Sequence, residues 1–250
     1  MAAKVTYDAI GRNYARHRQP DPRIDSQIEA ALGSAKLVLN VGAGTGSYEA
    51  NDRQVVAVEP SPVMVAQRSV GAAPALRAVA DALPFADDSF DAATAILTVH
   101  HWPDAAAGLA ELRRVAEGIV IFTFDPAVHA QYWLFEEYLP ESVTLDTWRT
   151  PPIQVVAEAV GADRVEVVPI PADCVDGFNW AYWRRPESYL DPDVRSCISG
   201  LAQLPDGLVA RRMERLAADL ADGTWHTRHA DLTQLDAVDG GFRLVVRSGR

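Results

Sequence analysis

Cysteine is scarce in this chain of 250 residues, which contains two cysteines, Cys174 and Cys197. Neither stands at a spacing typical of metal ligands, and two cysteines do not form a disulfide framework. The sequence therefore predicts no metal site and no structural disulfide. Because cysteines stay reduced inside the cell, this pattern indicates a cytoplasmic protein.

Long apolar runs are missing as well. No stretch approaches the roughly 20 apolar residues that a membrane-spanning helix needs. Residues 1–6 also lack the apolar core of a signal peptide. We therefore expect a protein without a membrane partner.

Basic residues are in deficit: Lys and Arg number 23 against 34 Asp and Glu, which gives a formal net charge of -11. Nucleic-acid-binding proteins usually present a basic face, so this balance argues against a nucleic acid partner. The composition is otherwise that of a globular protein, with 48% hydrophobic and 23% charged residues. A chain of this length can fold as one α/β domain with an insertion.

A glycine-rich turn follows an apolar run near the start of the chain. Residues 37–41 are apolar on both faces, which predicts a buried parallel strand, and Gly42, Gly44 and Gly46 follow it. We expect a helix to begin near Ser47, which would complete the nucleotide-binding corner of a doubly wound sheet. The spacing is G-x-G-x-G, whereas an NAD(P)-dependent oxidoreductase uses G-x-G-x-x-G.

A second strand is predicted over residues 54–58, directly before Glu59, Pro60 and Ser61. A carboxylate at this place can accept two hydrogen bonds from ribose hydroxyls, and the alternative is a solvated loop acid. Ser61 and Pro62 are typical of an N-cap and the first helical position.

The glycine spacing resembles the first motif of class I S-adenosylmethionine (SAM)-dependent methyltransferases, in particular the type-11 family that is similar to ubiquinone and menaquinone biosynthesis methyltransferases. Residues 79–91, read as V-A-D-A-L-P-F-A-D-D-S-F-D, resemble the family pattern G-D-A-x-x-L-P-F-x-D-x-S-F-D. The resemblance covers roughly residues 5–125. It implies a Rossmann-like α/β fold with a doubly wound, mostly parallel sheet of seven strands, and SAM as cofactor with S-adenosylhomocysteine as product.

The resemblance also implies where the cofactor is held. The glycine turn takes the methionine part, Glu59 the ribose, and the backbone near Ala80 the adenine. The residues expected to bind the cofactor are Tyr14, Asn40, Gly42, Ala43, Gly44, Gly46, Glu59, Pro60, Ala80, Asp81, Leu97 and Thr98.

This chain departs from the family pattern at two positions. Val79 stands where the family has an aspartate that accepts a bond from the adenine amino group, and Asp81 lies two residues later. Asp81 either contacts that amino group or caps the following turn. Asn40 replaces the usual acidic residue before the glycines, so it can keep hydrogen bonds but supplies no charge to the cationic cofactor.

Two histidines, His100 and His101, follow the predicted strand at residues 90–98. Ligands of doubly wound sheets lie at the carboxyl ends of the strands, and histidine is the natural general base near neutral pH. We predict His100 as the base and His101 as a substrate contact; the alternative is a structural histidine beneath the strand end. The segment lacks the [D/N/S]-P-P-[Y/F/W] motif that is typical of enzymes methylating exocyclic base nitrogens.

The sequence predicts four regions. Residues 1–34 form an N-terminal helical lid, with Tyr14 and Arg18 as its contacts to the ligands. Residues 35–171 form the SAM-binding domain, residues 172–232 a helical insertion that caps the substrate, and residues 233–250 the final, antiparallel strand at the edge of the sheet. The aromatic-rich residues 127–148 suggest an acceptor pocket with Trp133 and Tyr138 as substrate contacts.

Taken together, these features favour a SAM-dependent methyltransferase that transfers the methyl group to a small-molecule acceptor by in-line displacement. One alternative is a SAM-binding protein, regulatory or repurposed, that transfers no methyl group. A second alternative is the NAD(P)-dependent oxidoreductase, which leaves the match at residues 79–91 without an explanation. The sequence indicates neither the acceptor atom nor an oligomeric state.

Overall fold

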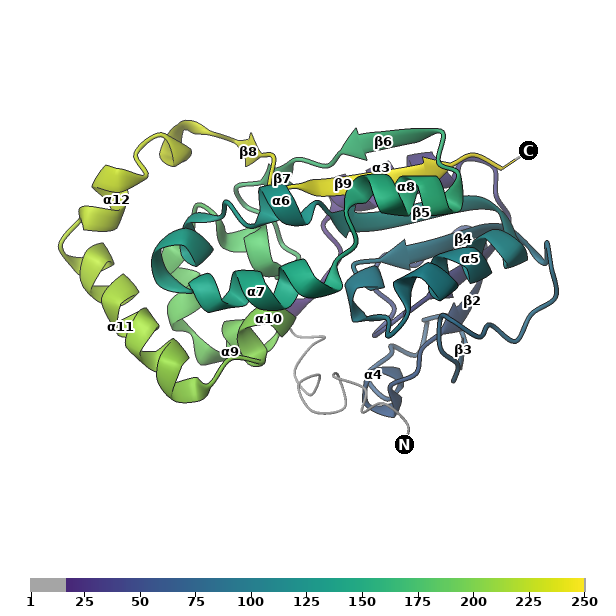
Figure 1. The fold of residues 1–250 in the computed structure, drawn as a ribbon, viewed down its shortest axis with the longest axis horizontal. Helices are drawn as coiled ribbons and strands as arrows, with labels where there is room; N and C mark the ends of the chain where they lie inside the picture. Colours follow the sequence, from purple (N-terminus) through teal and green to yellow (C-terminus); the bar gives the residue numbers. More distant parts are fainter. Residues whose placement is uncertain (1–16, 250) are drawn as a thin grey trace.

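The computed structural model describes residues 17–249, apart from the side chains of residues 144–148. The predicted contact Tyr14 and most of the predicted lid lie outside the described residues. Figure 1 shows a sheet with its helices on the right and a group of helices on the left.

The sheet has seven strands in the order β3-β2-β1-β4-β5-β9-β6. Strands β1 to β5 pair in parallel, and β9 runs antiparallel to both of its neighbours. The prediction of a mostly parallel, seven-stranded Rossmann-like sheet is confirmed. The strands are β1 (Leu37–Val41), β2 (Gln54–Val58), β3 (Ala75–Leu76), β4 (Phe90–Ile96), β5 (Ala116–Phe124), β6 (Arg164–Val167) and β9 (Phe242–Arg247).

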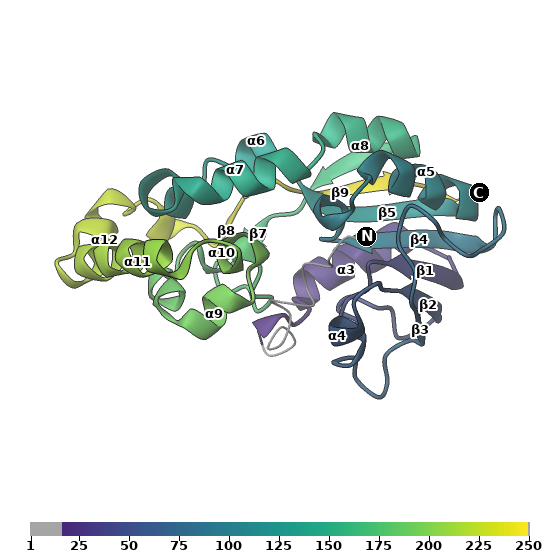
Figure 2. The same ribbon diagram turned by 60° about the horizontal axis from the view of Figure 1, so that its bottom comes forward.

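Helices cover both faces of the sheet, as Figure 2 shows. Helix α3 (Pro22–Leu32) lies on one face, and α5 (Ala105–Val115) and α8 (Ile153–Val160) lie on the other. Side chains alternate along each strand, so Ile119 and Ile121 of β5 pack with α5 and α8, whereas Val120 and Phe122 pack with α3. Burial on both faces explains why the central strands are apolar throughout.

The last strand was predicted at the edge of the sheet, and this prediction is wrong. Strand β9 is antiparallel as expected, but it lies between β5 and β6, and β6 forms the edge. The physical reason is the composition of the two strands. Phe242 and the run Leu244–Val246 are buried, whereas most of β6 is exposed. The more apolar strand therefore takes the interior position.

The helix predicted near Ser47 is absent from the structure. Residues 42–53 connect β1 to β2 through turns without a helix. Gly42, Gly44, Gly46 and Tyr48 all have positive φ angles, which interrupt right-handed helical geometry at alternate residues. The glycine loop, as we call residues 42–48, is therefore shaped by its own backbone and by side chains that hold it from outside.

The helical part is built from two segments that are far apart in the sequence. The first segment, which the sequence analysis assigned to the sheet domain, packs against the second: the Trp133 and Trp225 rings lie 5.2 Å apart, edge to face. We call both segments together the cap (left in Figure 1). The first segment holds α6 (Pro126–His129), the π-helix η3 (Leu134–Tyr138) and α7 (Pro140–Arg149). The second holds η4 (Asn179–Tyr182), η5 (Pro186–Leu190), α9 (Pro192–Ser196), α10 (Ser199–Ala202), α11 (Asp206–Ala221), α12 (Thr224–Arg228) and η6 (Leu232–Gln234).

The cap and one face of the sheet share a hydrophobic core. This core joins Ile24 and Ile28 of α3 with Phe122 of β5 and with Trp183 and Trp225 of the cap. A small sheet of β7 (Ile170–Pro171) and β8 (Ala237–Val238) lies where the chain enters and leaves the cap's second segment. The cap is thus tied to the sheet by packing as well as by the chain.

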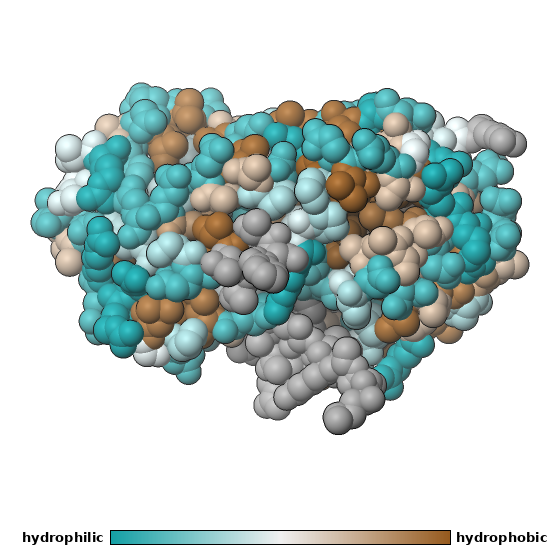
Figure 3. Space-filling view, viewed as in Figure 1, coloured by the Kyte–Doolittle hydropathy of each residue, from teal (hydrophilic) through white to brown (hydrophobic). Residues whose placement is uncertain are grey.

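The surface in Figure 3 is mainly hydrophilic over both the cap and the sheet part, with apolar side chains scattered among polar ones. Cys174 and Cys197 are both buried, and they form no disulfide with each other. In the described part of the chain, no helix is both long and apolar enough to span a bilayer.

Candidate functional site

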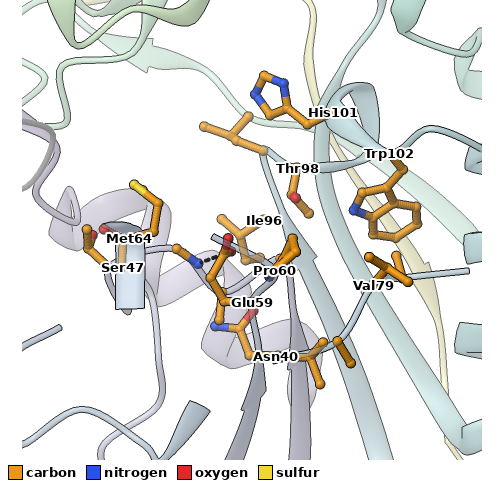
Figure 4. Close-up of a pocket in the computed structure, with 18 of the residues that line it drawn as sticks. Asn40, Ser47, Glu59, Pro60, Met64, Val79, Ile96, Thr98, His101 and Trp102 are labelled. Atoms are coloured by element: carbon orange, nitrogen blue, oxygen red, sulfur yellow. Dashed lines mark hydrogen bonds between the residues drawn. The ribbon is translucent and has the colours of Figure 1, made fainter. Parts of the chain in front are cut away.

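A cavity of about 460 Å³ opens at the carboxyl ends of β1, β2 and β4. We call it the main cavity; its size is typical of sites for small ligands. Figure 4 shows Glu59 near its centre, with Asn40 at one end and His101 at the other. The predicted residues that line it are Arg18, Asn40, Gly42, Ala43, Gly44, Glu59, Pro60, Ala80, Leu97, Thr98 and His101.

Gly42 sits where no side chain can be accommodated. A Cβ atom added to it would lie 2.0 Å from Oγ1 of Thr98, and its φ is +71°. The backbone N–H groups of Gly42 and Ala43 both donate to the carbonyl of Val58, at 2.9 and 3.0 Å. The glycine loop is therefore drawn onto the end of β2 and against the end of β4.

The Glu59 carboxylate holds the loop from the end of β2. It is 5% exposed and accepts hydrogen bonds from the backbone N–H groups of Gly44, at 2.9 Å, and Ser61, at 2.8 Å. Glu59 also lines the main cavity, so a ligand there can reach its carboxylate. Glu59 is the only acidic residue among the described residues that line it.

A buried ion pair braces the loop from behind. Arg68 pairs with Glu49 at 2.6 Å, and both side chains are 7% exposed. The Arg68 guanidinium also donates to the carbonyl of Gly44 at 3.2 Å, and the Asn40 amide donates to Glu49 at 3.1 Å. Asn40 thus binds a carboxylate that is already neutralised by an arginine, which explains how the loop forms without an acid at position 40.

The end of β4 brings Leu97, Thr98 and His101 to the cavity. Leu97 adopts a φ of +49°, and its N–H donates to the carbonyl of Phe122 at 2.7 Å. Residues other than glycine rarely adopt a positive φ, and such backbone strain is often found at ligand sites. The short helix η2 (Val99–His101) then turns the two histidines in different directions.

His101 faces the main cavity as a neutral imidazole. Burial of its ring lowers its pKa well below the ordinary value, and His100, Arg149 and Arg18 lower it further by charge repulsion. By surface area the His101 side chain is half-buried, because it borders the main cavity while the protein surrounds the rest of its ring. A neutral imidazole can accept a proton or a hydrogen bond and does not repel a cationic ligand.

His100 lies outside the main cavity, in a second and smaller one of about 40 Å³. The two imidazole rings are 3.9 Å apart between centroids, and Arg18 and Leu97 line both cavities. The two histidines therefore form part of the wall between the cavities.

One part of the main cavity is an apolar slot. Ala78, Val79 and Ala80 line one side, and Trp102 and Pro103 line another. Figure 4 shows the Val79 and Trp102 side chains next to each other. Asp81, by contrast, is exposed and does not line the cavity, so the structure does not bring it to the slot as an adenine contact.

Arg18 bridges the cavity and the cap. Its guanidinium pairs at 2.6 Å with Asp176, which stands just before the cap's second segment, and Asp176 is fully buried. The Tyr48 hydroxyl of the glycine loop donates to the same carboxylate at 2.9 Å. We call Arg18, Tyr48 and Asp176 the latch, because it joins the N-terminal segment, the glycine loop and the cap.

Trp133 and Tyr138 were predicted to contact the substrate, and the structure places them elsewhere. The Trp133 indole donates to the Trp183 carbonyl at 3.0 Å, and the fully buried Tyr138 hydroxyl donates to Asp219 at 2.6 Å. Neither lines a cavity described above, because Trp133, at the N-cap of η3, and Tyr138, at its end, both pack in the hydrophobic core. Gly46 also lies outside the main cavity, against Ala72 and Glu49.

Sequence reasoning missed Arg77, Trp102 and Met64, which line the main cavity. A signal existed for Trp102, which follows the two histidines directly. It packs on α5 at Gly108, where an added Cβ would lie 2.5 Å from the indole ring. Arg77 and Met64 come from a loop and a short helix, α4 (Pro62–Val65), and no spacing rule marks them.

Comparisons with known proteins agree with this geometry. A family model for a methyltransferase domain of type 11 matches residues 39–122. Among solved structures, the chain is similar to a protein described as a methyltransferase from an antibiotic biosynthesis pathway of Anabaena variabilis. Identity is 33% and the TM-score 0.85, over 93% of this chain and 99% of that one.

Two more distant structures show the fold alone. One is a SAM-dependent methyltransferase of Thermotoga maritima, with 20% identity and a TM-score of 0.53 over 66% of this chain and 84% of that one. The other is the [4+2]-cyclase SpnF, with 16% identity and a TM-score of 0.55 over 97% of this chain and 93% of that one. No curated protein matches the chain. The family model and the Anabaena structure establish that this chain belongs to the type-11 family of class I SAM-dependent methyltransferases, with SAM as its cofactor.

Proposed function

We propose that this protein transfers the methyl group of SAM to a small-molecule acceptor, with the main cavity as the cofactor site. The observation that carries the proposal is the meeting of the glycine loop, Glu59 and the end of β4 around one cavity of about 460 Å³. When bound, SAM supplies an electrophilic methyl group on a sulfonium.

The residues present fit this cofactor. Gly42 leaves the backbone bare where a Cβ would collide with Thr98, which suits the close approach of an amino-acid tail. Glu59 is placed to accept from ribose hydroxyls, and the slot at Val79 and Trp102 suits the adenine ring. The remaining work of the chain is to align the acceptor with the methyl group and to exclude water, and the cap and the latch serve both purposes.

The structure disfavours a dinucleotide cofactor. A pyrophosphate is usually held at the N-terminus of the helix that follows the glycine turn. Here the described residues 42–53 contain no helix, so that anion site is missing.

A small-molecule acceptor is supported by two observations. The net charge of -11 suits no nucleic acid substrate, and the relative at 33% identity is described with an antibiotic biosynthesis pathway. The alternative, a SAM-binding protein without methyl transfer, has a specific basis as well, because a [4+2]-cyclase shares the fold.

One experiment separates these functions. The purified protein is incubated with methyl-labelled SAM and either a whole cell lysate or its low-molecular-weight fraction, and the label is followed by size. We expect label in small molecules, dependent on intact Glu59. Label in protein or nucleic acid would contradict a small-molecule acceptor, and SAM binding without any transfer would favour the alternative.

A further inference from the structure

Strand β6 leaves one side of the sheet open. Among the described residues, β6 pairs in the sheet with β9 alone, and Figure 1 shows it at the upper border of the sheet with no element drawn beyond it. An open strand edge presents unpaired N–H and C=O groups to which a further strand can add, and proteins often block it with lysine, proline or a covering element. Strand β6 is short, but it contains neither lysine nor proline, so it can pair with a further strand.

The backbone groups of Val165 and Val167 face this open side. In an antiparallel pair, every second residue of a strand exchanges hydrogen bonds with its neighbour. The N–H of Val168 donates to the carbonyl of Phe242 in β9, at 3.0 Å, so alternate residues back to Arg164 also point to β9. The N–H and C=O groups of Val165 and Val167 therefore point away from β9.

The same two valines place apolar surface beside the open edge. Val165 lies opposite Val245 of β9, which packs with α5 and α8, so Val165 and Val167 project from the face that carries these helices. They are 42% and 47% exposed, and Val155 of α8 is 51% exposed. Pairing of this edge with another strand would bury part of this apolar surface.

Arg164 and Glu166 project from the other face of the sheet. They form an ion pair along the strand, and their side chains are 41% and 43% exposed. Strand β6 is thus neutral within a chain whose net charge is -11. Two copies of the chain repel each other less through this strand than through an acidic surface.

The charges select one alignment of two antiparallel β6 strands, because outward-facing residues must lie opposite one another. Centring the pair on Glu166 sets two glutamates against each other. Centring it on Val167 sets Val165 opposite Pro169, which has no N–H to donate. Centring it on Val165 sets Arg164 of each copy opposite Glu166 of the other. Side chains directly opposite lie about 5 Å apart at Cβ, so this alignment is stabilised by two pairs of opposite charges.

We infer that this protein forms a two-fold dimer in which two β6 strands pair antiparallel about Val165. The partner is a second copy of this chain, because the edge matches its own charge order when reversed, as a two-fold interface requires. Strand β6 runs parallel to β5, so the main cavities of the two copies open at opposite ends of the dimer. A strand of four residues gives a small interface, and the dimer is therefore weak, with a Kd of about 1–100 µM.

Sedimentation equilibrium at protein concentrations on both sides of this Kd tests the dimer. Val165→Pro removes the central outward N–H and leaves the hydrogen bonds to β9 in place, so it should weaken the dimer at least about tenfold. Binding of S-adenosylhomocysteine should stay unchanged, because the main cavity lies at other strands. A wild type that is monomeric at every concentration, or an unchanged dimer of Val165→Pro, would overturn the inference.

Charge variants test the alignment and stand even if Val165→Pro does not fold. Glu166→Arg gives a copy with two arginines on the edge, and Arg164→Glu gives a copy with two glutamates. Each variant alone should form a dimer at least about tenfold weaker than that of wild type. Mixed in equal amounts, the two should form a heterodimer, because every arginine again lies opposite a glutamate. Single variants that dimerise like wild type, or a mixture that stays monomeric, would overturn the inference.

Matched controls lie on α11, in the cap. Arg211→Glu and Glu214→Arg make the same changes of charge on exposed residues of this helix, and each should leave the dimer unchanged. Equal weakening by the α11 and β6 variants would mean that net charge rather than the β6 edge governs association, which would overturn the inference.

Discussion

Gly42 tolerates less change than Gly44, the other glycine of the loop that lines the cavity. Gly42→Ala would place a methyl group against Thr98 in a left-handed conformation, and together the clash and the φ strain should cost about 2–4 kcal/mol of stability. Gly44 has a similar φ, but its Cβ would lie 3.3 Å from the flexible end of Met64. Gly44→Ala should therefore cost only about 1–2 kcal/mol. Chemical denaturation of both variants measures the difference, and equal losses would contradict the close approach to Thr98.

Val79 marks the place where a carboxylate would restore the family pattern. Because Val79 lines the slot expected to hold adenine, Val79→Asp should add a hydrogen bond to the adenine amino group and tighten S-adenosylhomocysteine binding by about 1 kcal/mol. Asp81→Asn is the control: Asp81 is exposed and outside the cavity, so affinity should not change. Calorimetry would contradict this placement if Asp81→Asn weakened binding and Val79→Asp had no effect.

His101 makes stability depend on pH. Its folded pKa lies below the ordinary value of 6.5, chiefly because the ring is buried. As pH falls below about 6.5 the unfolded chain takes up a proton that the folded chain does not, so stability decreases by at most about 1.4 kcal/mol per pH unit. Denaturation curves between pH 7.5 and about 5 should show a shallower decline for His101→Gln than for wild type. His226→Gln changes an exposed histidine and should keep the wild-type decline. Identical declines for wild type, His101→Gln and His226→Gln would refute the burial of His101.

At the residue scale, the sequence placed residues at strand ends better than it placed the aromatic side chains of the cap. The glycines and Glu59 follow from strand ends and spacing, which are properties of the chain itself. Trp133 and Tyr138 were misassigned because a dense aromatic segment looks alike whether it lines a pocket or fills a core. Only the turn of η3 into the cap decides between the two.

The glycine loop is the element that departs most from expectation. The pattern of glycines predicted a helix at Ser47, and the structure instead holds the loop with the buried pair of Glu49 and Arg68. No local pattern reveals this, because Arg68 comes from beyond the next strand. The loop is thus stabilised by a tertiary contact that replaces a secondary-structure element.

Removing one partner of the Glu49–Arg68 pair should destabilise the fold more than removing both. Arg68→Met leaves the buried Glu49 carboxylate uncompensated and should destabilise the fold by about 3–5 kcal/mol. The double variant Glu49→Gln with Arg68→Met should recover part of that loss, because no buried charge remains. A double-mutant cycle by denaturation measures the coupling. Additive losses would show that the two side chains act independently.

At the scale of the whole molecule, the latch ties the cap to the cofactor site. Asp176→Asn weakens the compensation of the buried Arg18 and should cost about 3 kcal/mol of stability, with weaker S-adenosylhomocysteine binding through Tyr48. The neighbouring Asp173 pairs with Arg23 on the surface and is 79% exposed, so Asp173→Asn should cost less than about 1 kcal/mol. Thermal unfolding with and without S-adenosylhomocysteine compares them. Equal effects of both variants would mean that the latch does not couple cap and loop.

The sheet order follows from apolar strands and their spacing, so most of it was predictable. The position of β9 and the two-segment cap were not, because both depend on which apolar surfaces meet after the chain has folded back. Strand β9 lies inside the sheet, next to β5, because it is more apolar than β6. This difference matters only in the folded chain, where either strand could pair with β5.

The central claim is that the main cavity holds SAM with Glu59 at the ribose. Calorimetric titration of wild type and Glu59→Gln with S-adenosylhomocysteine and with NAD tests it most directly. We predict tight binding of S-adenosylhomocysteine and none of NAD to the wild type, and a loss of about 1.5–3 kcal/mol in the variant, because a charged acceptor is replaced by a neutral one. Binding of NAD, or unchanged affinity of Glu59→Gln for S-adenosylhomocysteine, would contradict the account.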